Sequence, residues 1–341
     1  MRTSTILLSA GEPKRPADST ASIFKRFSKT VVSGAAALLG AMALCVGGGT
    51  AYAASLEQPG EGVGIPLGMP FPEGVYFENT LSGGGWRGID DHLAGLTVEI
   101  PFGLWSTPWT FFNGRIEVAI AAPSVIGTVP EALAPGASFA GRSYLDMYNP
   151  TIFVGMAWDL GDGLGISAWQ GVWFPVNNEL RLFGNDTWVS SQKLFVTYAP
   201  KGTGWSFTGN VTFAQTGNTL VPTVYNPTGY SPFGAKVLPD YLNYELALTK
   251  TIGKWELGIW AFGSADMSNA LTNIATGRQS QFAIGPMVGY EFTGITTQFW
   301  VTRDVFTEGY FNTDGSRSYE TRVWGRAIIP LWTAPVEMPL K

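Results

Sequence analysis

Few residues in this chain could perform nucleophilic or acid–base chemistry. His92 is the single histidine and Cys45 the single cysteine among 341 residues. Since structural and catalytic zinc sites need three or four His, Cys or carboxylate ligands, a multi-His metal centre is excluded. Asp90 and Asp91 directly precede His92 and could imitate part of a hydrolase triad, but they fall in or near an expected loop. The sequence predicts no metal, no cofactor and no catalytic residue, with an enzyme centred on His92 kept as an alternative.

The other candidates are charged and tryptophan side chains that interrupt otherwise apolar segments. A charge that faces hydrocarbon costs a few kcal/mol, so we expect these side chains to point into a wet or paired lumen. They could line a pathway for a solute, or they could form salt bridges that merely hold a barrel together. The expected lumen-facing residues are Glu78, Glu99, Arg115, Glu117, Asp159, Lys193, Glu245, Glu256, Trp260, Trp300, Arg322 and Arg326.

The spacing of these residues around turns predicts which of them meet. Folding the chain at a turn near 106–108 brings Glu99 close to Arg115. Folding it at 251–252 brings Glu245 near Glu256, and such a like-charge pair could raise one pKa or bind a cation.

Two arginines in the last expected strand also have predicted neighbours. Arg322 and Arg326 lie one strand from Asp304, and closure of a barrel would place both arginines near Glu78.

Alternating hydrophobicity defines the elements that must position these side chains. Residues alternate between apolar and polar in 205–214, 241–249, 281–292 and 96–100, which is the period of a β-strand. Short Gly/Pro turns are expected near 106–109, 161–163, 200–204, 251–254 and 293–294. Longer connections near 83–91, 124–146, 178–186, 219–238, 268–277 and 308–317 alternate with them. This order is typical of a transmembrane antiparallel up-and-down β-barrel with about 12 strands, and a soluble β-sandwich is the alternative.

Composition agrees with a membrane barrel. The chain is 45% hydrophobic but 14% charged, against roughly 25% charged residues in an average soluble protein. Acidic residues outnumber basic ones by 26 to 21, and no basic patch follows residue 53, so nucleic acid is not an expected partner. Tryptophans beside the expected short turns predict an aromatic girdle at one membrane interface. They are Trp105, Trp109, Trp158, Trp205, Trp255 and Trp332.

The chain divides into four expected parts. Residues 1–53 combine a basic stretch, a short apolar run and a small-x-small ending, which predicts a cleavable secretory signal. Residues 54–73 are too rich in Gly and Pro for a regular strand or helix, so they form either a periplasmic lead or a plug in the lumen. Residues 74–332 form the barrel, and 333–341 form a tail after the last strand.

Several segments resemble a known family. These are GVYFENT at 74–80, GISAWQGVWFPV at 165–176, 188–218, and PDYLNYELALTKTIGKWELGIWAFGSADMS within 239–304. They are similar to outer-membrane transporters of the "MetA-pathway of phenol degradation" family. The resemblance implies a porin-like barrel in the outer membrane of a Gram-negative cell, which passively takes up small hydrophobic, aromatic compounds. Its implied partners are outer-membrane lipid, the solute and the barrel-assembly machinery, although the tail after Trp332 departs from the usual aromatic C-terminus. A sealed structural or surface-interaction barrel remains the alternative.

Overall fold

A computed structural model of the protein describes residues 57–87, 93–128, 143–176, 187–217, 238–267, 278–309 and 317–335. The regular elements of these ranges are β-strands. No helix among the described residues is long and apolar enough to cross a membrane. The strands are β1 (Gly74–Arg87), β2 (Leu93–Phe111), β3 (Gly114–Ala121), β4 (Ser124–Thr128), β5 (Ser143–Met147), β6 (Thr151–Gly161), β7 (Leu164–Trp173), β8 (Val189–Tyr198), β9 (Trp205–Thr216), β10 (Tyr241–Ile252), β11 (Trp255–Asp266), β12 (Ser280–Phe292), β13 (Ile295–Glu308) and β14 (Thr321–Thr333).

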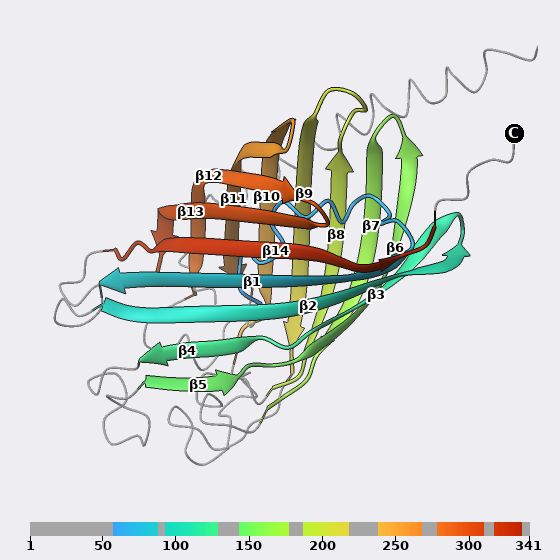
Figure 1. Ribbon diagram of the computed structural model, residues 1–341. Coiled ribbons are helices and arrows are strands. Elements are labelled where there is room, and N and C mark those ends of the chain that lie inside the picture. The colour runs from blue at the N-terminus through green and yellow to red at the C-terminus, as the bar shows by residue number, and fades with distance from the viewer. Residues whose placement is uncertain are drawn as a thin grey trace, which may run out of the picture. The chain divides into compact units, whose positions relative to one another are not determined.

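The strands close into one antiparallel barrel. Neighbours in sequence pair with each other from β6 to β14, and β1 pairs with β14 on one side and with β2 on the other (Figure 1). At the seam, Glu78 of β1 lies opposite Ile328 of β14. Closure leaves no open edge along this ring, as a barrel in lipid requires. The expected up-and-down barrel of 12 strands is therefore confirmed.

Two of the twelve wall strands are interrupted. Strand β2 pairs with β3 through residues 102–111 and with β4 through 96–99, so β3 and β4 are two halves of one wall strand. The same holds for β5 and β6, which pair with β4 and β3. Pro123 and Pro150 stand at the two breaks, and proline has no N–H to give to a ladder. Bonds from the Ala122 N–H to the Pro101 oxygen and from the Tyr148 N–H to the Pro123 oxygen span the gaps.

The short turns gather at one end of the barrel with the expected aromatic side chains. Trp109, Trp205 and Trp255 are each about half exposed there. The expected turn near 106–109 is wrong, because β2 continues through an irregular stretch to Phe111 and turns at Phe112 and Asn113, which both have positive φ. The other short connections lie where they were expected, between β6 and β7, β8 and β9, β10 and β11, and β12 and β13.

Alternation sorts side chains between the two faces of the wall. Thr208 of β9 and Asn243 of β10 are buried inside, while Leu248 of β10 is 49% exposed on the outside. Other exposed apolar side chains of the strands extend this outer belt: Ile120, Ile152, Val154, Leu194, Ile259, Ile284, Phe299 and Val323. An apolar belt on the outer face is the surface that hydrocarbon requires.

Candidate functional site

Residues 57–73 lie inside the barrel, ahead of the first strand. We call this stretch the lumen segment, and Figure 1 shows it as the blue trace between the strands. It forms successive tight turns, in which the Glu61 N–H bonds to the Gln58 oxygen and the Ile65 N–H to the Gly62 oxygen. Gly60 and Gly64 have φ values of +91° and +80°, which L side chains rarely adopt. The Gly/Pro composition thus gives the lumen segment a compact, irregular conformation.

Wall side chains bind the backbone of the lumen segment. The Glu245 carboxylate of β10 accepts hydrogen bonds from the N–H groups of Gly60 (2.8 Å) and Gly62 (3.3 Å). Further along, the Glu117 carboxylate of β3 accepts from the Phe71 N–H at 2.9 Å. The lumen segment is buried and irregular and has no regular backbone hydrogen bonding of its own, so its N–H groups need such partners. These carboxylates therefore set the position of the segment.

Arg326 of β14 binds the carbonyl groups of the same stretch. Its guanidinium donates to the Val63 oxygen at 2.7 Å and to the Glu61 oxygen. It also forms an ion pair of 2.9 Å with Glu78 of β1, and the Arg326 side chain is fully buried. The expected meeting of Arg326 with Glu78 across the closed seam is found. One cation thus joins the lumen segment to both strands of the seam.

Lys193 of β8 pairs with two carboxylates of the lumen segment. It contacts Glu57, and its Nζ lies 3.5 Å from the Glu61 carboxylate. Burial raises the pKa of the Glu61 carboxyl well above its usual value, the nearby Glu57 adds to the rise, and Lys193 opposes it. The described charges in this part of the lumen include more carboxylates than cations, since Glu245 lies nearby as well.

On the β11, β13 and β14 side, the lumen segment packs on three buried tryptophans, Trp260, Trp300 and Trp324, which we call the tryptophan cluster. The Trp260 and Trp300 rings meet edge to face at 4.6 Å, and those of Trp300 and Trp324 stack at 5.3 Å. The Arg326 guanidinium lies 4.9 Å from the centre of the Trp300 ring, within cation–π range. Val63 of the segment is 1% exposed and packs against the tryptophan cluster.

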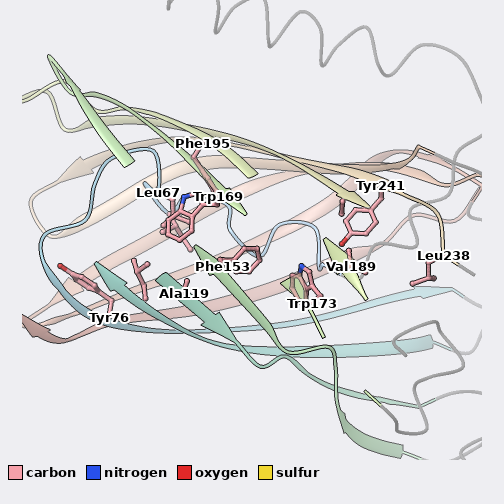
Figure 2. Close-up of a cluster of buried hydrophobic side chains, with 13 residues drawn as sticks. Leu67, Tyr76, Ala119, Phe153, Trp169, Trp173, Val189, Phe195, Leu238 and Tyr241 are labelled. Carbon is pink, nitrogen blue, oxygen red and sulfur yellow. The ribbon is translucent and has the colours of Figure 1, made fainter. Parts of the chain in front are cut away.

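On the opposite side, a small apolar cavity lies between the lumen segment and the wall. Its volume is about 50 Å³. Figure 2 shows Trp169, Phe153 and Phe195 in the larger apolar cluster that borders it, close to Leu67 of the segment. The cavity is lined by Glu61, Gly62, Ile65, Leu67, Glu78, Ile100, Phe102, Ala119, Ala121, Phe153, Trp169, Lys193 and Phe195.

The structure places most of the expected lumen residues on the inner phase of their strands. Glu78, Glu117, Glu245, Trp260, Trp300, Arg322 and Arg326 are buried. Glu256 is half-buried and accepts a bond of 2.9 Å from the Gln298 amide. Arg115 and Asp159 share the inner phase but lie near the turns, where Arg115 donates to the Thr107 oxygen and Asp159 accepts from the Gly161 N–H. Arg322 bonds to Ser82 and Glu320.

Glu99 was expected to face the lumen, and this prediction is wrong, because the residue faces outward. Its neighbours Val98 and Ile100 are each 5% exposed, and Ile100 lines the cavity. Glu99 lies opposite the half-exposed Leu81 and accepts a bond of 3.1 Å from the Asn79 amide. The inner phase of β2 is apolar because it packs within the filled lumen, so the assumption that the apolar phase faces lipid fails for this strand.

Two expected pairs are also wrong. The β2–β3 turn lies further along the chain than expected, so Arg115 is opposite Thr110 and not near Glu99. In the β10–β11 hairpin, Glu245 lies opposite Phe262, whereas Glu256 lies opposite Thr251. The like-charge pair therefore does not form.

Sequence reasoning missed the partners that the lumen segment itself supplies. Glu57 and Glu61 precede the first strand, and no alternation marks them as interior residues. Thr197, which accepts a bond of 3.2 Å from the Gly68 N–H, looks like any polar residue of a strand. His92, with Asp90 and Asp91, lies outside the described residues, as do 1–53 and 336–341.

Comparisons with known proteins fit this architecture. A family model described as "Putative MetA-pathway of phenol degradation" matches residues 91–320. An outer membrane channel from Pseudomonas putida F1 superposes with a TM-score of 0.55 at 12% identity, covering 80% of this chain and 100% of that one. This likeness concerns the fold.

Two further solved barrels are less similar. The NanC porin has a TM-score of 0.44 at 10% identity, covering 74% of this chain and 100% of its own. The CymD monoaromatic hydrocarbon channel has a TM-score of 0.41 at 8% identity, covering 77% and 90%. No curated protein matches the chain.

Proposed function

The chain belongs to the family described as the MetA-pathway of phenol degradation, and from this premise we propose that it is an outer-membrane channel for passive uptake of small hydrophobic, aromatic compounds. The concentration gradient supplies the energy. No cofactor or catalytic residue takes part, and the partners are membrane lipid, the solute and, during biogenesis, the assembly machinery.

The apolar cavity beside the lumen segment carries this proposal. Water-filled porins have polar interiors, whereas the buried side chains of Trp169, Phe153 and Phe195 line the cavity here. Ligand pockets for apolar molecules typically combine such walls with a few polar groups, as Lys193 and Glu78 provide. At about 50 Å³ the cavity is smaller than the roughly 150 Å³ apolar cavity that accepts benzene. Entry of an aromatic ring therefore requires the lumen segment or its neighbours to move.

Flux through proteoliposomes tests the proposal. We expect phenol and toluene to enter faster than into protein-free vesicles, while a sugar of similar size does not. Equal entry of all three would instead indicate a general pore.

The tight filling of the lumen favours a second candidate, a sealed structural or surface-interaction barrel. Its prediction is no protein-dependent flux of any solute. An outer-membrane enzyme centred on His92 would show turnover that His92→Ala abolishes.

The orientation of the wall provides a separate test of the outer-membrane location. A charge at Leu246 or Phe207 faces lipid and should block assembly, because such a charge costs a few kcal/mol near mid-depth. The same charge at Asn243 or Thr208, inside the barrel, should be tolerated. Heat-modifiable migration of the membrane fraction measures assembly, and equal tolerance at all four positions would contradict the orientation. Export through the signal predicts a mature protein that begins at Ala54, which N-terminal sequencing checks.

A further inference from the structure

Two hydrogen-bond donors in the tryptophan cluster lack an acceptor. The indole N–H groups of Trp260 and Trp300 are buried and have no hydrogen-bond partner among the described residues. The third member differs, because the Trp324 indole donates to the Thr302 hydroxyl at 3.1 Å. A buried donor without an acceptor costs free energy, so its presence at two adjacent rings needs a reason.

The lumen segment occupies the space in front of these rings. A Cβ added at Gly64 would lie 2.2 to 2.9 Å from Cζ2, Cε2 and Cη2 of Trp260, so the six-membered part of this indole lies directly against the segment. Val63 supplies an apolar side chain to the cluster, and its carbonyl oxygen accepts from Arg326. The segment thus presents an apolar group next to an oxygen acceptor.

We propose that the tryptophan cluster and Arg326 form a binding site for a neutral, flat, apolar solute that carries one oxygen acceptor, such as a phenol, and that residues 61–64 are its internal competitor. This inference rests on the proposed function, because it names the place where a solute pauses in the lumen. The solute ring replaces Val63 against the indole faces. Its oxygen accepts from the free indole N–H groups, and from Arg326 once the segment carbonyls have left.

Charge in the lumen selects a neutral ligand over an anion. Arg326 is already paired with Glu78, and Lys193 is paired with Glu57 and Glu61. An aromatic carboxylate would enter a lumen whose described cations are already neutralised, and it would meet those buried carboxylates. A phenol brings an acceptor without this repulsion, and toluene brings the ring without the acceptor.

Tryptophan side-chain NMR tests the site directly. Protein labelled with ¹⁵N at the indoles, in lipid nanodiscs, is titrated with phenol, toluene and benzoate. The variants Trp260→Phe and Trp300→Phe each remove one indole signal and so assign the two peaks. We expect phenol to shift both peaks downfield as the N–H groups gain an acceptor, toluene to produce no downfield shift, and benzoate to leave them unmoved.

Binding of phenol by the variants gives a second readout. Each Phe variant should lower the ratio of phenol to toluene affinity about fivefold, the effect of losing one net hydrogen bond, because the smaller ring reduces the apolar contact with both solutes alike. Trp324→Phe is the matched control, since its N–H already has a partner in the protein, and the ratio of phenol to toluene affinity should stay constant. Val63→Ala weakens the packing of the internal competitor, so the affinity of this variant for phenol should rise.

The outcomes separate this site from the channel proposal. Selective flux of phenol with both indole peaks unmoved would overturn the site and leave the channel intact. Shifted peaks without any flux would support the site and contradict the channel. An equal fall in the ratio of phenol to toluene affinity in Trp324→Phe and the two test variants would also overturn the site.

Discussion

The two sides of the lumen hold the same segment in different ways. On the side of β10 to β14, polar groups fix its backbone, with Glu245 and Arg326 binding N–H and C=O groups, and the rings pack tightly against it. On the side of β1 to β8, Glu117 and Thr197 also accept N–H groups of the segment, but apolar side chains border it there and a cavity of about 50 Å³ remains. Directional bonds fix one geometry, whereas apolar contacts tolerate rearrangement. The second side therefore has room to yield, whereas on the first side a solute must displace the segment itself.

Removing the main anchor should have the largest effect. Arg326→Met leaves Glu78 buried without its cation, and breaking a buried pair from one partner costs about 3–5 kcal/mol. We expect a marked fall in the thermal midpoint of the detergent-solubilised barrel. Arg303→Met is the control, because Arg303 is exposed and bonds to the Tyr319 oxygen. Similar losses in the two variants would refute the anchoring role.

Expelling the segment should have the next largest effect. A Cβ at Gly64 would overlap the Trp260 ring, and its φ of +80° disfavours any L side chain. Gly64→Leu should therefore displace the segment and raise single-channel conductance in planar bilayers several-fold. Gly202→Leu carries the same backbone strain at an open turn, with φ of +75°, and should conduct like the unaltered protein. An unchanged conductance for Gly64→Leu would show that the segment does not obstruct the lumen.

Enlarging the yielding side should have a moderate effect. Leu67→Ala removes a side chain that lines the cavity, and a buried Leu→Ala change costs about 2–5 kcal/mol when the site does not collapse. We expect the variant to be less stable and to bind more benzene, as measured by solute binding to the solubilised protein. Leu248→Ala on the outer face serves as the control and should leave uptake as it is. If benzene binding does not increase, the neighbouring side chains refill the space.

The smallest effect is expected at Glu61. Burial raises the pKa of the Glu61 carboxyl above its usual 4.5. The contribution of Glu61 to docking of the lumen segment is therefore complete below pH 4.5, and it is lost as the pH rises through the raised pKa. Glu61→Gln carries a permanently neutral group, so its thermal midpoint should depend less on pH than that of the unaltered protein. Thermal scans from about pH 4 to pH 9 make the comparison. A pH dependence that the substitution leaves intact would assign it to other groups.

Sequence alternation predicted the wall better than it predicted the contents of the barrel. The strand number and four of the five short turns follow from period-two patterns and Gly/Pro signals that are local to each hairpin. Glu99 was misplaced because apolar residues serve two environments here, lipid outside and a filled interior inside. Pairing errors such as Glu245 with Glu256 arise because hairpin register depends on the precise turn residues. Contacts such as Arg326 to Val63 join distant parts of the chain, and no local pattern encodes them.

The pairing of the first strand, β1, with the last, β14, has a consequence for biogenesis. Because β1 closes against β14, the ring cannot be completed until the C-terminal strand has been exported. The stretch just ahead of β1 is held by residues from β3, β8, β10 and β14, so it must be enclosed as the ring is completed or be threaded into it afterwards. In the first case, the pairing of β1 with β14 that completes the barrel also traps the segment inside it.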